Sequence, residues 1–246
     1  MKVAGITERE EEFYRFLTYL IKEHNLPDTS SEKFVFIPYI KYSVKTEYLD
    51  KFVIYEHWWQ RKPEIVKSKI KSLLKISERI HGRQCLVKKL NKPEADIFLE
   101  KNHIFGATNS KIKYGLFFHD KLVGIATFAG QRQFINGSRS GELLRFCIKN
   151  GYSVTGGLDK LLQTYIRKYK PNTLMTYIDL DWGRGDAFLN LGFENQELKT
   201  PITFFVNIKN GERIPEKYFS DTENKGNYVK VRNKGSIKMI KTLQKL

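Results

Sequence analysis

The residues best suited to chemistry lie on a predicted strand that reads GELLRFCI. Strand side chains alternate between two faces, so Glu142 should share one face with Leu144 and Phe146. A carboxylate on such an apolar face holds its proton more tightly and could act as a general base. The structural alternative is a salt bridge to a neighbouring arginine, Arg139 or Arg145.

Two further candidates are Asp179 and His103. Asp179 and Asp181 end the next predicted strand, over residues 173–180, and alternation places both carboxylates on one face. With His103 they could bind a divalent metal, but paired carboxylates are common at solvent-facing strand ends. We therefore interpret Asp179 as a base or hydrogen-bond partner for a substrate and assign no metal ligand. His103 is either catalytic or a cap on the C-terminus of the preceding helix.

A glycine turn lies between these two strands and opens an amphipathic helix. From Leu158 to Ile166 the apolar residues recur with the i, i+3, i+4, i+7, i+8 spacing of a helix that packs on a sheet. The backbone N–H groups at a helix N-terminus attract anions such as phosphate. We therefore expect the turn at Gly156 and Gly157, next to Ser153 and Thr155, to hold the phosphates of a donor or of the DNA backbone.

Trp182 and Arg184 follow the second strand and are separated by one glycine. An exposed aromatic ring can stack on a nucleobase, and a guanidinium can bind a phosphate. The alternative is that Trp182 packs in the core at the start of a helix. Arg132 and Arg139 lie in a polar loop before Glu142 and could extend a basic rim.

The net charge of +16 is large for 246 residues, and it is unevenly distributed. Lys and Arg are concentrated between Arg61 and Lys92 and again after Lys225. This excess favours a polyanionic partner such as DNA or RNA, although a solvated, lysine-rich surface is the alternative. We expect DNA binding that weakens strongly with salt. The predicted contacts are Arg145, Trp182, Arg184, Lys67, Lys71, Arg132 and Arg139.

Composition favours a folded cytoplasmic protein. Hydrophobic residues make up 41% of the chain, enough for a sizeable core, and no run of about 18 apolar residues is present. The N-terminus lacks the apolar segment of a signal peptide. Cys85 and Cys147 are too few for a disulfide framework or a four-cysteine zinc site, so we expect buried, reduced thiols.

The order of predicted elements indicates an α/β fold with a mixed sheet. One parallel crossover follows an antiparallel start, in the order βα-ββ-βαβ-αβ, which differs from a doubly wound sheet. The predicted elements are strands at 84–90, 114–119, 122–128, 142–148, 173–180 and 203–208, with helices at 93–101, after 158 and before Leu191.

That order, with the glycine turn and the pair Gly192-Phe193, resembles the GNAT acyltransferase fold over roughly residues 84–208. The resemblance implies that the loop from Ser153 through Gly156 cradles the pyrophosphate of acetyl-CoA or a related CoA donor. The tyrosine that usually serves as general acid in that family is matched here by Phe188, which has no hydroxyl.

Five segments are also similar to the Mom-type DNA-modification proteins of bacteriophages and mobile elements: FLEKNHIFG, IKYGLFFHDKLVGIATF, ELLRFC, VTGGLDKLL and YIDLDWGRGDAF. This resemblance implies a GNAT-fold transferase that installs a group on adenine. It matches His103, Glu142, Arg145 and Asp179 to motif positions of that family, and we expect His103, Glu142 and Asp179 to manage protons.

The segment FVIYEHWWQRKPEIVKSKIKSLL resembles the end of very-short-patch-repair-like and homing-type nuclease domains. Such nucleases hold Mg²⁺ with an Asp and an Asp/Glu-x-Lys pair. Asp50 could begin a site of this kind, but no Glu-x-Lys follows it. We therefore expect a degenerate nuclease-like, basic α+β module in residues 1–82, a GNAT-like domain in 83–210 and a basic tail in 211–246.

Three functions are compatible with these observations. The first is a nucleic-acid-directed transferase of phage or mobile-element type that modifies a base or amine with a small acyl-like group. The second is a non-enzymatic DNA-binding accessory protein on a decayed transferase scaffold. The third is a CoA-dependent N-acetyltransferase. Binding of a CoA donor would separate the first and third from the second, and salt-sensitive duplex binding would separate the first two from the third.

Overall fold

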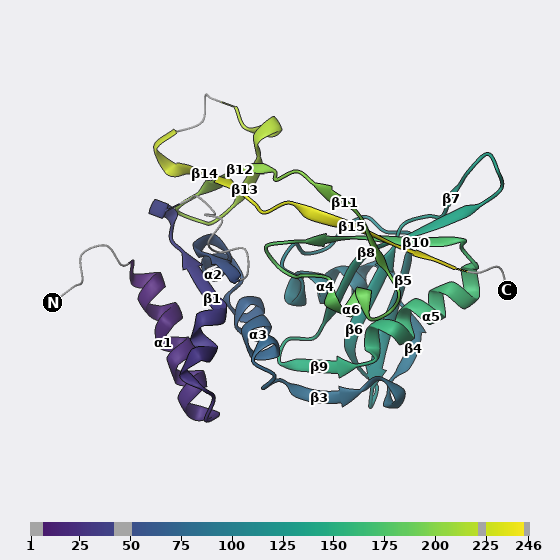
Figure 1. The fold of residues 1–246 in the computed structure, drawn as a ribbon, viewed down its shortest axis with the longest axis horizontal. Coiled ribbons are helices and arrows are strands. Elements are labelled where there is room, and N and C mark those ends of the chain that lie inside the picture. The colour runs from purple at the N-terminus through teal and green to yellow at the C-terminus, as the bar shows by residue number, and fades with distance from the viewer. Residues whose placement is uncertain (1–6, 42–50, 221–224, 244–246) are drawn as a thin grey trace. The chain divides into compact units, whose positions relative to one another are not determined.

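The computed structural model describes residues 7–41, 51–220 and 225–243 (Figure 1). Two compact units alternate along the sequence. Unit 1 consists of Met1–Val66, Asp179–Arg184 and Lys199–Ser236, and unit 2 consists of Lys67–Ile178, Gly185–Leu198 and Ile237–Leu246. These boundaries differ from the expected divisions after residues 82 and 210. Asp50, the candidate for a nuclease-like site, lies outside the described residues.

In the described residues, unit 2 is built on an eight-stranded mixed sheet, which confirms the predicted fold class. Its strands are β4 (Leu86–Lys89), β5 (Ile112–Phe118), β6 (Lys121–Phe128), β7 (Arg132–Gln133), β8 (Arg139–Ile148), β10 (Thr173–Asp179), β11 (Glu194–Lys199) and β15 (Ser236–Thr242). The order across the sheet is β11-β15-β10-β8-β6-β5-β4, and β7 pairs with the start of β8. β4, β5, β6 and β8 are antiparallel neighbours, whereas β8 and β10 are parallel.

Three helices accompany this sheet: α4 (Lys92–Asn102), α5 (Gly157–Tyr169) and α6 (Asp186–Leu189). The predicted amphipathic helix is α5, and it buries Leu158, Leu161, Leu162 and Tyr165 in the core of unit 2. The Tyr165 ring stacks on Phe128 of β6, with 4.1 Å between centroids. Lys170, with φ of +43°, ends α5 before Pro171, as the sequence predicts.

The predicted hairpin of β5 and β6 is confirmed. Its two-residue turn, His119-Asp120, has φ values of +45° and +58°, which suit a tight hairpin between twisted strands.

A bulge in β8 changes which side chains share a face. Thr127 pairs with Arg145 and Phe128 pairs with Leu143, so Leu144 is one residue extra in β8. Phe146 therefore packs in the same core cluster as Leu143. The expected alternation of Glu142, Leu144 and Phe146 on one face is wrong for Phe146, because the extra residue reverses the pattern.

A short strand that the sequence did not predict precedes α5. It is β9 (Tyr152–Thr155), which pairs in parallel with β3 (Glu78–His81) in a separate two-stranded sheet. The turn η4 (Gly82–Gln84) follows β3 directly and leads into β4. These elements determine the surroundings of the glycine turn.

The described residues of the expected basic tail contain three strands, and one of them belongs to the sheet of unit 2. Figure 1 shows β15, in yellow, between β10 and β11. Met239 of β15 is fully buried in the core of unit 2. The strand expected at 203–208 does not end this sheet. It is β12 (Thr203–Asn207), which joins β13 (Arg213–Pro215) and β14 (Tyr228–Arg232) in a three-stranded sheet of unit 1.

Unit 1 begins with α1 (Glu8–Glu23), whose Thr7 hydroxyl accepts a hydrogen bond from the backbone N of Glu10 at 3.2 Å. Its buried face contains Phe13, Leu17 and Leu20, as the periodicity predicts. The remaining elements are the parallel strands β1 (Phe34–Ile37) and β2 (Phe52–Tyr55), α2 (Glu56–Arg61), the first part of α3 (Pro63–Leu73), and the single turns η1 (Asp28–Lys33), η2 (Tyr39–Lys41), η5 (Glu216–Tyr218) and η6 (Lys225–Asn227).

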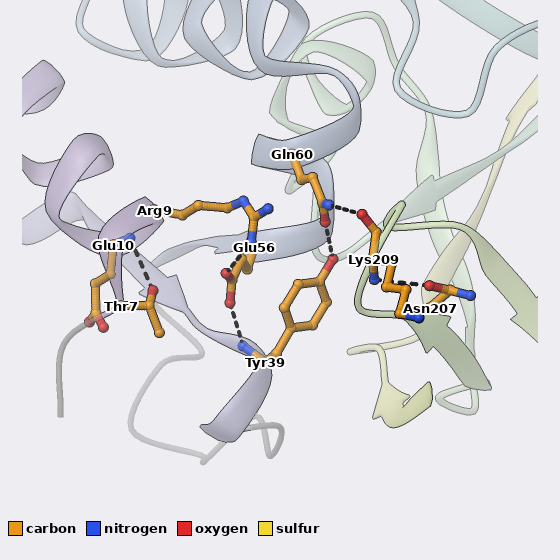
Figure 2. A network of polar contacts seen from close by, with 8 residues as sticks. All are labelled: Thr7, Arg9, Glu10, Tyr39, Glu56, Gln60, Asn207 and Lys209. Atoms are coloured by element: carbon orange, nitrogen blue, oxygen red, sulfur yellow. Dashed lines mark hydrogen bonds and ion pairs between the residues drawn. The ribbon is translucent and has the colours of Figure 1, made fainter. Parts of the chain in front are cut away.

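A polar network joins these elements of unit 1 (Figure 2). The buried Glu56 carboxylate accepts hydrogen bonds from Arg9 at 3.1 Å and from the backbone N of Tyr39 at 2.7 Å. The Tyr39 hydroxyl donates to Gln60, and Gln60 donates to the carbonyl of Lys209, both at 2.6 Å. Segments far apart in the sequence are thereby connected through satisfied polar groups.

Both cysteines are free thiols; Cys85 is buried and Cys147 is half-buried. Burial raises the pKa of both thiols. None of the described helices is long and apolar enough to cross a membrane.

Candidate active site

The parallel pair of β8 and β10 separates part-way along its length. The pairing runs from Ser140 and Thr173 to Leu143 and Thr176, and no further pair is present in the described strands. At that point the Thr176 hydroxyl donates a hydrogen bond to the Leu143 carbonyl at 3.1 Å. β8 continues to Ile148, so its last five residues have backbone groups without a strand partner on this side.

Glu142 lies directly before this separation. It is half-buried and pairs with Met175 of β10, so the two side chains share one face of the sheet. Tyr177 follows two residues later on the same face, and 43% of its surface is exposed. Tyr177 carries no sequence motif that marks it as a candidate. Strand alternation would have placed it with Met175, but only the pairing register shows that both lie on the face of Glu142.

His103 has the structural role named above as the alternative. It is the C-cap of α4, and its backbone N donates to the carbonyl of Leu99 at 2.8 Å. Its Nδ1 accepts a hydrogen bond from the backbone N of Phe105 at 3.1 Å. These contacts hold the imidazole against its own loop.

Arg145 reaches the loop that follows α4. Its Nη1 donates to the carbonyl of Leu144 at 2.9 Å, and its Nε donates to the carbonyl of Gly106 at 3.4 Å. Burial lowers the pKa of the guanidinium. Two of its donors are therefore directed at backbone oxygens, which limits the expected role of Arg145 in binding DNA.

The glycine turn has one open side. Thr155 and Gly156 are exposed, Gly156 has φ of +74°, and no side chain caps the helix N-terminus. The other side is covered by η4: a Cβ added to Gly82 would lie 2.9 Å from the carbonyl oxygen of Thr155 and 3.0 Å from the amide nitrogen of Gly157. An anion can therefore approach the turn from the side of Thr155 and Gly156.

Lysine and arginine residues lie on the elements next to this turn, together with one carboxylate, Asp159, in the first turn of α5. Lys160, in the first turn of α5, donates to the carbonyls of Gly82 at 3.0 Å and of Cys85 at 2.5 Å, which fixes η4 in place. Arg79 of β3 is the strand partner of Ser153 in β9, and Ser153, a predicted donor-binding residue, is half-buried. Arg83 of η4 is exposed. The charge around the turn suits a phosphate group.

Asp179, the third catalytic candidate, belongs to unit 1, whereas Glu142 and His103 belong to unit 2. Its Oδ1 accepts a hydrogen bond from the backbone N of Asp181 at 2.9 Å. The Oδ1 of Asp181 accepts from the backbone N of Lys234 at 3.1 Å and from the hydroxyl of Tyr55 at 3.5 Å. Asp179 therefore takes part in a buried polar cluster of unit 1.

The electrostatics of this cluster oppose ionisation. Burial raises the pKa of both carboxyls, and the Asp179 charge adds to the effect on Asp181, whose pKa rises to about 7. Arg213 stabilises both carboxylates and lies 3.9 Å from the centroid of the Phe204 ring. The same buried environment and the charge of Arg213 lower the pKa of His57 well below its usual value.

His57 itself is buried, with only 1% of its surface exposed. Trp58 and Trp59 are buried as well. Trp182 is half-buried and meets Trp58 edge-on at 5.3 Å, which is the packed alternative considered for it. Arg184 is exposed, with its guanidinium 5.2 Å from the centroid of the Phe52 ring.

The remaining predicted DNA contacts lie on three elements. Lys67 and Lys71 are half-exposed on α3. Arg132 and Arg139 are exposed on β7 and at the start of β8.

No protein-family model matches the chain, and no curated protein matches it. Among solved structures it is similar to the ribosomal-protein-S18-alanine N-acetyltransferase of Escherichia coli, at 14% identity over 66% of this chain and 96% of the other, with a TM-score of 0.43. It is also similar to a Bacillus subtilis acetyltransferase solved with CoA, at 13% identity over 65% of this chain and 99% of the other, with a TM-score of 0.42. A GNAT family acetyltransferase from Elizabethkingia anophelis, solved with acetyl-CoA, is similar at 12% identity over 65% of this chain and 99% of the other, with a TM-score of 0.42. These values describe a likeness of fold alone.

Proposed function

We propose that unit 2 is an acyltransferase that uses a CoA-type thioester as its donor. The observation that carries the proposal is the separation of β8 from β10, taken together with the exposed turn at Thr155 and Gly156 that opens α5. Both features lie at the carboxyl ends of the parallel strands, because α5 begins where β8 and β9 have ended. Open α/β sheets bind their ligands at this edge.

The chain offers a fit for each part of such a donor. The amides of a pantetheine arm can pair with the last five residues of β8, in the way an added strand pairs with a sheet edge. The phosphates can lie at the N-terminus of α5, near Arg79 and Arg83. The similar proteins solved with CoA or acetyl-CoA suggest the same donor, but the proposal rests on the strand geometry.

The residues at the separation have roles that fit amide formation. A bound CoA thioester would supply an activated acyl group. Glu142 would accept a proton from the acceptor amine as its nitrogen bonds to the acyl carbon, and Tyr177 would donate a proton to the departing sulfur. Phe188 meets Phe193 edge-on at 5.4 Å in the core of unit 2. Tyr177 would therefore supply the hydroxyl that position 188 lacks.

For the acceptor we propose an amine of a nucleic acid, as in the DNA modification that the Mom-type resemblance implies. The net charge of +16 and the exposed Arg132 and Arg139 support this choice. A second candidate is a DNA-binding protein without catalysis. Its specific support is Gly82, which covers one side of the turn where donor phosphates would bind.

Thermal unfolding with CoA and acetyl-CoA tests the donor. Thr155 is exposed, so Thr155→Glu should fold normally while its carboxylate repels the donor phosphates; Thr155→Gln is the uncharged control of similar size. We expect both ligands to raise the Tm of the wild type and of Thr155→Gln, and to leave Thr155→Glu unchanged. If millimolar CoA leaves the wild-type Tm unchanged, the donor proposal is wrong and the non-catalytic alternative gains support.

A further inference from the structure

The β7–β8 hairpin presents two apolar side chains to solvent. Residues 134–138 form its tip, between the paired positions Arg132–Ser140 and Gln133–Arg139. Phe134 is 45% exposed and Ile135 is 110% exposed. Figure 1 shows this hairpin extending away from the sheet of unit 2. Burying these side chains against a partner would release the water that now surrounds them.

Hydrogen bonds hold the tip in one shape. The backbone N of Phe134 donates to the carbonyl of Ser138, and the backbone N of Gly137 donates to the carbonyl of Phe134, both at 2.9 Å. The side chain of Asn136 accepts from the backbone N of Ser138 at 3.0 Å. The apolar side chains are therefore displayed by a closed loop.

The base of the hairpin is attached to the end of α5. Asn172 accepts from the backbone N of Arg139 and donates its own N–H to the Arg139 carbonyl, both at 2.7 Å. On the other strand, the Gln131 amide donates to the carbonyl of Tyr169 at 3.0 Å. The hairpin and the last turn of α5 thus form one surface.

The charge on that surface has a single sign. The sequence contains no Asp or Glu between residues 121 and 141 or between 160 and 178. The Arg132 guanidinium lies 5.8 Å from the centroid of the Phe134 ring, next to the apolar tip. The exposed cations of the surface are Arg132, Arg139, Arg167, Lys168 and Lys170.

We propose that this hairpin docks on duplex DNA, with the arginines on the phosphates and Phe134 and Ile135 inserted between base pairs. A groove of B-form DNA accepts a two-stranded ribbon, and apolar wedges such as Phe and Ile unstack base steps and bend the duplex. The deep, narrow major groove of A-form RNA does not admit such a ribbon. The proposal rests on the nucleic-acid acceptor proposed above and is independent of the donor.

The test uses the full-length protein and a 20-base-pair DNA duplex with a dye at each end. Anisotropy measures affinity between about 50 and 200 mM salt, and energy transfer measures bending. Phe134→Ser/Ile135→Ser should bind about tenfold more weakly and lose the bend, with an unchanged salt slope. Arg132→Gln/Arg139→Gln should reduce the slope by about 2, because each phosphate contact contributes roughly 0.9.

A matched control removes two positive charges elsewhere in unit 2. Lys101 and Lys121 are exposed, and Lys121 lies at the end of β6 opposite to β7. Lys101→Gln/Lys121→Gln should retain the bend and most of the salt slope. All variants should retain the wild-type Tm, because every substituted side chain is exposed.

Three outcomes would overturn the proposal. The first is a tip variant that binds and bends DNA as the wild type does. The second is equal affinity for duplex RNA of the same sequence. The third is a tip variant whose only change is the loss of a dimer in sedimentation, since the tip would then contact a second copy. The effect of CoA on the Tm is measured separately for the wild type and the tip variant. If DNA bending depends on the tip but CoA does not raise the Tm, the DNA-docking proposal is supported and the CoA-donor proposal is refuted.

Discussion

Replacing Asp181 with asparagine should stabilise unit 1 strongly at pH 8 and considerably less at pH 5. Asp181 is 3% exposed, and its Oδ1 accepts hydrogen bonds from the backbone N of Lys234 and the hydroxyl of Tyr55. An asparagine amide oxygen can accept the same bonds. The substitution therefore removes the ionisation and preserves the contacts.

The magnitude follows from the raised pKa of Asp181. Burial and the Asp179 charge raise it from 3.8 to about 7, against the opposing effects of Lys234 and Arg213. Between about pH 4 and pH 7 the folded protein holds a proton that the unfolded chain has lost, so stability decreases as pH rises through this window. At about 1.4 kcal/mol for each pH unit, the decrease is on the order of 4 kcal/mol by pH 8.

Tryptophan fluorescence during urea unfolding measures this effect where it occurs. The chain has three tryptophans, Trp58, Trp59 and Trp182, and all belong to unit 1. Unfolding curves at pH 5 and pH 8 then give the free energy of unfolding of unit 1 for each protein. We expect the gain of Asp181→Asn over wild type to grow by several kcal/mol from pH 5 to pH 8.

Asp28→Asn is the matched control, because Asp28 is an exposed aspartate of the same unit. It should change the free energy of unfolding by less than about 0.5 kcal/mol at either pH. An Asp181→Asn gain that is the same at both pH values, or a loss at pH 8, would show that the carboxyl is ionised at no cost in the folded protein. The reasoning from burial would then be refuted.

Four further predictions concern the proposed site, the packing of unit 2 and the polar network of unit 1. Glu142→Gln should lower kcat about a hundredfold if Glu142 is the general base, and Tyr177→Phe should lower kcat about tenfold or more while leaving the Tm unchanged. Gly141→Ala should destabilise unit 2 by about 1–3 kcal/mol in thermal unfolding, because the added Cβ would lie 2.6 Å from the hydroxyl of Tyr165. Glu56→Ala should cost about 1–3 kcal/mol in urea unfolding, because it leaves the backbone donor of Tyr39 without its acceptor, whereas the Arg9 side chain is 40% exposed and stays solvated; a cost below about 0.5 kcal/mol would contradict the role assigned to the network in Figure 2.

Some site features could be predicted because they depend on neighbours in the sequence. Gly156 begins α5 in the left-handed conformation, and the helix buries the apolar face that its spacing predicts. Neighbours in the sequence could not predict that Tyr177 shares a face with Glu142, or that Gly82 covers one side of the glycine turn. The register of β8 with β10 determines the face of Tyr177, and η4 reaches the turn from more than 70 residues earlier in the chain.

The edge strand β11 and the bulge in β8 were the other features that the sequence-based predictions missed. β11 reads ENQELK and is almost fully exposed, so it carries no hydrophobic signal. The apolar segment at Thr203–Asn207 was therefore taken for the last strand of the sheet, although it belongs to unit 1. The bulge at Leu144 likewise has no local signature, because it depends on pairing with β6.

The sequence by itself determined the mixed α/β class, the β5–β6 hairpin, the amphipathic α5 and the excess of positive charge, because periodicity, turn residues and composition are local properties. Only the tertiary structure decided where the polar residues act. It placed Asp179 with Asp181 in unit 1, kept Glu142 in unit 2 beside the separation of β8 and β10, and brought β15 between β10 and β11. The physical reason is that strand pairing and the burial of charge join residues distant in sequence, and no local pattern encodes which partner is chosen.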